Sequence, residues 1–205
     1  MRPISSFLAA LAVLLAAATA VAQTSAPPTP ANVRGKIIKL DGQTLVIKTR
    51  EGKTASIKLA DDYRVLTVAK MKLSDIKQGD FVGAAATPDK SGKLQAREVL
   101  IFPEAMRGTG EGNYPWDYTQ GETMTNATVA EVVSQPKGRV LQLQYKGGAN
   151  EIYVSPKTTI VTFAPGDPSL LKPGAVIFAR GPLGPDGQIT ARGVTVGKNG
   201  VNPPM

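Results

Sequence analysis

An internal repeat constrains this chain more than any other feature. Residues Ile76–Ile101, IKQGDFVGAAATPDKSGKLQAREVLI, recur as Leu171–Val196, LKPGAVIFARGPLGPDGQITARGVTV, at a shift of 95 residues and without a gap. Seven aligned positions are identical, among them Arg97 and Arg192. A fixed internal period is stronger evidence of architecture than local propensity. The sequence therefore predicts two similar small domains.

Alternation of apolar and polar residues with a period of two predicts β-strands in both copies. In the first copy the expected strands span residues 33–40, 44–49, 55–59, 81–86 and 94–101, with a helical turn over 73–79. The apolar face of the last strand slips by one residue between Ala96 and Val99, which predicts a β-bulge. Three strands, a short helical connection and two strands is the order of an OB-like barrel, and an SH3-like barrel fits nearly as well. The predicted fold class is mainly β: two tandem five-stranded OB-like barrels joined by an aromatic, Gly-rich connector.

Both ends of the chain are expected to lie outside the barrels. Arg2, an apolar run and the small-x-small pattern at Ala20–Ala22 predict a signal peptide cleaved near Ala22, and hence a periplasmic or secreted protein. The apolar run is too short to span a bilayer comfortably, so no transmembrane anchor is expected. The predicted segments are a signal peptide (1–22), a Pro-rich disordered leader (23–32), a first barrel (33–103), a connector (104–126), a second barrel (127–198) and a tail (199–205).

Composition excludes most classes of enzyme. The chain contains no His and no Cys, which removes the usual ligands of zinc and type-1 copper and the Ser-His-Asp and Cys-His nucleophile pairs. We therefore expect a protein that is not an enzyme and that has no cofactor and no metal site. A remote alternative is a carboxylate-dependent hydrolase, because paired Asp and Glu side chains suffice to hydrolyse glycosides.

Basic residues concentrate in the predicted barrels. The formal net charge is +8, and residues 33–103 contain 14 Lys and Arg against 8 Asp and Glu, whereas the connector contains one against four. A positive field favours acidic partners such as an acidic envelope polymer; the alternative is a solvated surface that keeps the protein soluble. Nucleic acid is disfavoured, because single-strand binding also needs aromatic residues along the basic stripe. The predicted electrostatic face of the first barrel consists of Arg34, Lys36, Lys48, Arg50 and Lys58.

The connector, EAMRGTGEGNYPWDYTQGETMTN, is the strongest candidate for a functional site, because it contains the only Trp of the chain. One interpretation is structural: its aromatic residues bury against one or both barrels and its acidic residues settle against the basic barrel faces. The other is a contact surface for a ligand or partner. The thioethers of Met106 and Met124 as ligands of Cu(I) are a weaker third interpretation. The candidate contact residues are Trp116, Tyr114, Tyr118, Met106, Arg107 and Asp117.

Residues Leu73–Val129, LSDIKQGDFVGAAATPDKSGKLQAREVLIFPEAMRGTGEGNYPWDYTQGETMTNATV, also carry a family resemblance. The chain resembles an uncharacterised family of exported bacterial proteins with duplicated OB-like domains. The likeness extends over nearly all of the chain beyond the signal peptide, and the connector is its most recognisable part. Membership would imply this fold and this compartment, and no established activity.

The sequence thus predicts a non-enzymatic binding or interaction protein of the bacterial envelope, whose partner is an envelope protein or an acidic envelope polymer. The alternative is a small-molecule, glycan or metal site at the connector between the barrels. One residue distinguishes these two hypotheses. A protein contact requires an exposed Trp116, whereas a ligand site between the barrels requires a cavity that Trp116 lines.

Overall fold

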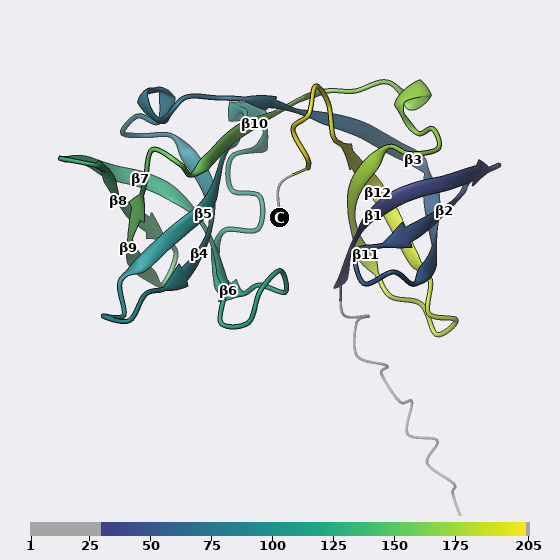
Figure 1. Ribbon diagram of the computed structural model, residues 1–205, viewed down its shortest axis with the longest axis horizontal. Helices are drawn as coiled ribbons and strands as arrows, with labels where there is room; N and C mark the ends of the chain where they lie inside the picture. Colours follow the sequence, from purple (N-terminus) through teal and green to yellow (C-terminus); the bar gives the residue numbers. More distant parts are fainter. Residues whose placement is uncertain (1–29, 204–205) are drawn as a thin grey trace, which may run out of the picture.

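A computed structural model describes residues 30–203 of the chain (Figure 1). Within this range no helix is both long enough and apolar enough to cross a membrane. Strands and single 3-10 turns make up the regular structure. In chain order they are β1 (Pro30–Asp41), β2 (Thr44–Thr49), β3 (Thr54–Lys70), η1 (Leu73–Asp75), β4 (Phe81–Pro88), β5 (Leu94–Ile101), η2 (Glu104–Met106), β6 (Gly112–Pro115), β7 (Thr123–Gln135), β8 (Gly138–Tyr145), β9 (Gly148–Val154), β10 (Thr159–Pro165), η3 (Pro168–Leu170), β11 (Val176–Pro182) and β12 (Ile189–Val196).

Five strands close into a barrel, here called the first barrel, in the order β1, β2, β3, β12, β11 and back to β1. All neighbours are antiparallel except β3 and β12, which are parallel. Closure satisfies the backbone hydrogen bonds that a sheet edge would leave unpaired. Because successive strand residues point to opposite faces, alternate apolar residues fill one interior. They include Ile37, Leu45, Ile47, Ile57 and Leu59.

The strands β4, β5, β7, β8 and β9 form the second unit, with the same order of pairing. β7, β8 and β9 make a meander, and β4 lies between β7 and β5. β5 returns to β9 through only two residue pairs, Leu94–Ile152 and Gln95–Tyr153. The core of this unit is separate from that of the first barrel. It includes Val82, Val99, Val129, Leu141 and Leu143.

The strand pairing differs from the predicted tandem arrangement, because the two repeats exchange their last two strands. β4 and β5 of the first repeat complete the second unit, and β11 and β12 of the second repeat complete the first barrel. Residues 33–103 and 127–198 are therefore not separate structural units. The physical reason is β3, whose 17 residues form one continuous strand that spans roughly 55 Å at about 3.3 Å per residue. This length carries the chain out of the first barrel before β4 begins.

β3 and β10 join the two units, across the top of Figure 1. They pair antiparallel with Val68 opposite Phe163, and these two residues are equivalent at the repeat shift of 95 residues. The junction therefore has an approximate local two-fold symmetry. Consistent with it, β10 lies parallel to β5 as β3 lies parallel to β12. A small third core stabilises the junction and includes Val68, Phe81, Leu100, Phe102 and Val161.

Local predictions for the first repeat hold in part. The strands at 44–49 and 94–101 have the expected bounds, and a 3-10 turn lies at Leu73–Asp75. The expected bulge is confirmed, because pairing with β4 passes from Glu98 directly to Ala96 and leaves Arg97 as the extra residue. The expected end of the third strand at residue 59 is wrong. β3 continues because its outer half pairs with β12 and β10.

The ends of the chain also differ from expectation. Residues 30–32, expected to be disordered leader, belong to β1 and pair with β11. The tail is held in place at Val201, which forms a β-bridge with Lys198 and packs against the third core. The predicted signal peptide, residues 1–22, lies outside the described residues.

The strand exchange predicts how the protein responds to a cut in its connector. A protease site inserted after Gln120, in the exposed turn 119–121, should allow cleavage without separation of the two halves. The reason is that β1 and β3 remain paired with β11 and β12, and β4 remains paired with β7. Size-exclusion chromatography of the cleaved protein should give one native peak that resolves into two fragments only in denaturant. Two separate native peaks would contradict the exchange.

Candidate ligand-binding site

The connector lies between the first barrel and the second unit, where β6 is seen in Figure 1. η2 follows β5, and β6 adds to the outer side of β7 through pairs such as Tyr114–Met124. The segment from Trp116 to Glu122 then turns back, closed by a hydrogen bond from the Trp116 amide to the Glu122 carbonyl at 2.8 Å. This turn is where the connector contacts both units.

Ion pairs hold the connector turn on each unit. On the first barrel, Asp117 accepts hydrogen bonds from both guanidinium nitrogens of Arg34, at 2.8 and 3.1 Å. On the second unit, the bulged Arg97 donates to Glu122 at 2.7 Å, and the Glu122 side chain is fully buried. Loss of one partner of a buried pair commonly costs about 3–5 kcal/mol. The predicted contacts between acidic connector residues and basic barrel faces are thus present at Asp117 and Glu122.

Tyr118 joins the two units through cation–π contacts. The guanidinium of Arg97 lies 3.9 Å from the ring centroid and that of Arg50 lies 4.1 Å from it. Arg50 also donates to the Tyr118 carbonyl at 2.9 Å. Since Arg50 follows β2 and Arg97 belongs to β5, one aromatic ring links the first barrel to the second unit. Such contacts are worth about 0.5–2 kcal/mol each, depending on desolvation.

Trp116 is buried, with 7% of its surface exposed. Its ring meets Tyr114 edge-on with centroids 6.1 Å apart and Phe178 of β11 at 6.4 Å. Ala85 of β4 and Met124 of β7 complete the cluster. The side chain therefore packs against residues of both units, as the structural interpretation of the connector predicts.

A cavity of about 620 Å³ opens beside Trp116, here called the inter-unit cavity. Residues of the first barrel, the second unit, the connector and β10 all contribute to it. Its walls are largely apolar and aromatic, with a few polar groups. The lining residues are Leu66, Phe102, Met106, Thr109, Gly110, Glu111, Tyr114, Trp116, Met124, Asn126, Phe163, Phe178, Arg180, Gly193 and Thr195.

Trp116, Asn126 and Tyr114 carry polar atoms beside this cavity, whose lining also includes the charged residues Glu111 and Arg180. Among the described residues, neither Trp116 Nε1 nor Asn126 Oδ1 has a hydrogen-bond partner, although both atoms are buried. A buried unpaired group costs about 1–3 kcal/mol. Asn126 uses its Nδ2 to donate to the Thr109 carbonyl at 3.0 Å and to the Tyr114 hydroxyl at 3.2 Å. Burial raises the pKa of the Tyr114 phenol, opposed by the positive charge of Arg180, so the phenol keeps its proton. Tyr114 thus lines the cavity as a neutral phenol, whereas Trp116 Nε1 and Asn126 Oδ1 are shielded from solvent.

The predicted contact residues of the connector separate into three groups. Trp116, Tyr114 and Met106 line the inter-unit cavity, and so does Met124. Tyr118 and Asp117 instead hold the connector on the barrel. Arg107 lies away from both, bound to Glu104 at 2.6 Å and to the Gly79 carbonyl at 2.9 Å.

Sequence analysis missed several cavity residues because they come from other strands. Phe178, Arg180, Gly193 and Thr195 belong to β11 and β12, which enter this region only through the strand exchange. The repeat aligns these strands with β4 and β5 but does not say which copy closes which unit. The chain therefore contains no local pattern that places them beside Trp116.

The predicted electrostatic face forms only in part. Arg34, Lys36, Lys48 and Arg50 line one cavity of the first barrel. Lys58 is exposed on β3 and does not line it.

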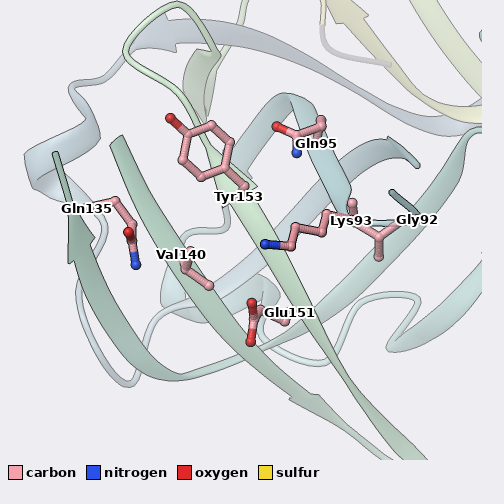
Figure 2. Close-up of a pocket in the computed structure, with 8 residues that line it drawn as sticks. Gly92, Lys93, Gln95, Gln135, Val140, Glu151 and Tyr153 are labelled. Carbon is pink, nitrogen blue, oxygen red and sulfur yellow. The ribbon is translucent and has the colours of Figure 1, made fainter. Parts of the chain in front are cut away.

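A further cavity, of about 540 Å³, lies in the second unit where β5 and β9 share only two residue pairs. Figure 2 shows Lys93, Glu151 and Tyr153 among the side chains around it. Glu151 accepts from Gln142 at 2.9 Å, and the Tyr153 hydroxyl donates to the Lys137 carbonyl. Both hydrogen bonds lie within the β7–β8–β9 meander and do not cross the β5–β9 seam, and we assign no function to this cavity.

Truncation of Trp116 should destabilise the protein. Trp116→Ala removes a buried aromatic side chain that packs against both units, and such changes typically cost about 3–5 kcal/mol. The free energy of unfolding in urea should fall by that amount, and Trp116→Phe should lose clearly less. An unchanged unfolding transition for Trp116→Ala would contradict the packing described here.

Asp117 should make stability sensitive to acid. Partial burial raises the pKa of its carboxyl, but hydrogen bonds from Arg34 and Asn32 outweigh burial and hold the pKa below its usual value. The resulting stabilisation is present above the unfolded-state pKa of about 3.9 and is lost as the pH falls through the folded-state value.

Melting temperatures measured from about pH 6 to about pH 2 should therefore fall more steeply for the native protein than for Asp117→Asn. Parallel curves would show that the Asp117–Arg34 pair contributes nothing to the pH dependence.

No protein-family model, curated protein or solved structure matches this chain. Function must therefore be inferred from the chemistry of the site, since one fold can serve many functions.

Proposed function

We propose that this protein is a non-enzymatic binding protein that holds a small ligand in the inter-unit cavity. The observation that carries this proposal is the position of Trp116, which is buried and lines a cavity between the units. Of the two hypotheses from the sequence, a buried Trp116 favours the ligand site over a protein contact, in which the aromatic residue must be accessible. We retain as proposals the export of the protein to the bacterial envelope and an OB-like fold for each unit.

The size and chemistry of the cavity support a small organic ligand. Pockets for such ligands usually measure about 300–1,000 Å³, lie at domain interfaces and combine apolar walls with a few polar groups. At about 620 Å³ the inter-unit cavity falls in this range. Its aromatic side chains suit a flat, mostly apolar molecule. Polar groups on that molecule would pair with the Tyr114 hydroxyl or the Arg180 guanidinium, since both residues line the cavity.

The two repeats differ at the positions that form this site. Phe178 and Arg180 of β11 line the cavity, whereas their equivalents at the shift of 95 are Gly83 and Ala85 of β4. A side chain on Gly83 would collide with Asn126, whose Oδ1 would lie 2.7 Å from an added Cβ. Small residues on one unit thus make room for the connector, and large ones on the other provide the wall. This division supports a specialised site at the seam.

A carboxylate-dependent hydrolase is less well supported. It requires two carboxyl groups that face each other across a cleft. The buried carboxylates Glu98 of β5 and Glu122 of the connector instead meet the guanidinium of Arg97, at 3.7 and 2.7 Å. The positive charge of Arg97 neutralises charge on these carboxylates, whereas a hydrolase needs one carboxyl group to accept and release a proton during the reaction.

The only Trp of the chain provides a direct test of binding. N-phenyl-1-naphthylamine, a flat apolar fluorophore with one N–H donor, is the probe. If it binds beside Trp116, excitation of the indole should produce naphthylamine emission by energy transfer, and the signal should saturate with increasing probe.

Gly193 allows the cavity to be filled without a collision. It lies two residues from Thr195 on the same face of β12, and both line the cavity. The nearest atom to an added Cβ is the Arg64 carbonyl oxygen at 4.0 Å. Gly193→Leu should therefore weaken probe binding by about tenfold or more, equivalent to at least about 1.4 kcal/mol, with little loss of stability.

Thr190→Leu is the matched control, because it adds apolar bulk to an exposed position of the same strand outside the cavity. It should bind the probe like the native protein. Equal binding by Gly193→Leu and the native protein would refute the inter-unit cavity as the binding site.

A further inference from the structure

A second cavity, of about 690 Å³, lies on the outside of the first barrel beside Tyr118 and is here called the basic cavity. Four of its lining residues are cations, and none is acidic within the described part of the chain. The lining residues are Arg34, Gly35, Lys36, Lys48, Thr49, Arg50, Tyr118, Val176, Ile177, Phe178, Asn202 and Pro203.

The register of β1 and β2 gathers the four cations on one face. Lys36 lies directly opposite Lys48, and the Arg50 amide donates to the Arg34 carbonyl at 3.1 Å. Residues two apart along a strand share a face, so Arg34 and Lys36 on one strand lie beside Arg50 and Lys48 on the next. The result is a two-by-two array of positive charge.

Two of these cations have no counter-charge within the described residues. Within residues 30–203, neither Lys36 nor Lys48 forms an ion pair, and both are exposed. Like charges placed directly opposite each other across a strand pair destabilise the pair. The arrangement costs stability unless an anion neutralises both ammonium groups.

The two arginines are held in place by the connector. Arg34 is bound bidentately to Asp117 and has 13% of its side chain exposed. Arg50 donates to the Tyr118 carbonyl at 2.9 Å and lies over the Tyr118 ring. The connector thus contributes Tyr118 to the cavity and fixes Arg34 and Arg50, while Lys36 and Lys48 have no ion-pair partner among residues 30–203.

The rest of the lining is suited to an organic group. Lys36 lies opposite Val176, and Arg34 lies opposite Phe178, across the β1–β11 ladder, which places these apolar residues on the same face as the cations. Tyr118 also lines the cavity, with the guanidinium groups of Arg50 and Arg97 over its ring. A volume of about 690 Å³ exceeds what a single inorganic ion fills.

We propose that the basic cavity is an anion site for an organic phosphate monoester, independent of the ligand in the inter-unit cavity. A phosphate monoester carries a charge of about −1.5 to −2 at pH 7 and three acceptor oxygens, which matches the unpaired charge of Lys36 and Lys48. A carboxylate or a sulfate monoester carries only one negative charge. The organic part of the ligand packs on the apolar part of the lining, which includes Val176 and Phe178.

Phenyl phosphate is the soluble probe, measured by calorimetry at constant ionic strength against phenyl sulfate and inorganic phosphate. The native protein should bind phenyl phosphate most tightly, because phenyl sulfate lacks the second charge and inorganic phosphate lacks the ring. Absence of saturable phenyl phosphate binding, together with no binding in the vesicle measurement below, would overturn the proposal.

The decisive variants are Lys36→Gln/Lys48→Gln and its matched control, Lys53→Gln/Lys58→Gln. Both lower the net charge by two, and the control residues are exposed on the same barrel outside the cavity. The first variant should lose about tenfold or more in affinity, whereas the control should lose less than about threefold, as expected for long-range screening alone. Equal losses would reduce the site to general surface charge and overturn it.

Removal of the two lysines also relieves their repulsion. Without an anion, Lys36→Gln/Lys48→Gln should melt at the same temperature as the native protein or higher. Loss of binding therefore cannot be ascribed to unfolding, and a lower melting temperature would contradict the repulsion from which the site is inferred.

A phosphate monoester can be a free metabolite or the headgroup of a lipid, and a vesicle measurement distinguishes these sources. Sedimentation is compared for phosphatidylcholine vesicles with and without phosphatidic acid. Binding that needs phosphatidic acid, Lys36 and Lys48 supports a headgroup, whereas saturable phenyl phosphate binding without vesicle binding supports a free ester.

Discussion

The exchange of closing strands between the two repeats is the constraint on which the rest of the structure depends. Each unit takes three strands from one repeat and two from the other, so neither core is complete without the whole chain. Loss of one unit would expose the apolar interior of the other and leave strand edges unpaired. The relative placement of the units is therefore set by backbone hydrogen bonds rather than by a flexible linker, and a site built between them has fixed walls.

The connector then converts a nearly symmetric junction into an asymmetric one. The paired strands β3 and β10 obey the repeat symmetry around Val68 and Phe163, but the connector occurs once, between the repeats. Asp117 and Glu122 of the connector each form an ion pair with an arginine, Arg34 of the first barrel and Arg97 of the second unit. Trp116 fills the space beside β4. The arginine equivalent to Arg97, Arg192, forms an exposed pair with Asp62 at 3.1 Å. Equivalent bulged residues thus have a buried role in one unit and a surface role in the other.

Strands, turns and the bulge could be predicted because they depend on local patterns. Alternation gave β2 and β5 their correct bounds, and the slip in the apolar face correctly indicated the bulge at Arg97. The pairing partners of β4 and β5 could not be predicted in this way. The same inward-facing residues would allow β4 and β5 to complete either the first repeat or the second. The length of β3 decides between these two pairings. In the sequence, Asp61 and Asp62 interrupt the apolar alternation and conceal that length.

The candidate sites show the same limit. Trp116 and the basic residues of β1 and β2 stood out in the sequence because rare or charged residues were close together along the chain. Phe178, which lines both cavities, had no such signal, since its importance comes from the residues that β11 meets after the exchange. Within the repeat it simply aligns with Gly83. Its role becomes apparent only when the single connector is placed against it.

A duplication by itself would create two equivalent surfaces, and this chain departs from equivalence where the connector needs space or a wall. Gly83 and Ala85 on β4 are small and leave space for the connector against the second unit. An added Cβ at Gly83 would collide with Asn126. At the same register β11 carries Phe178 and Arg180, which stand against Trp116 at 6.4 and 5.8 Å. The residues at these positions belong to neither barrel core, so packing within each unit does not explain why the two repeats differ there. The requirement comes from the seam, and this is the physical reason to place function there.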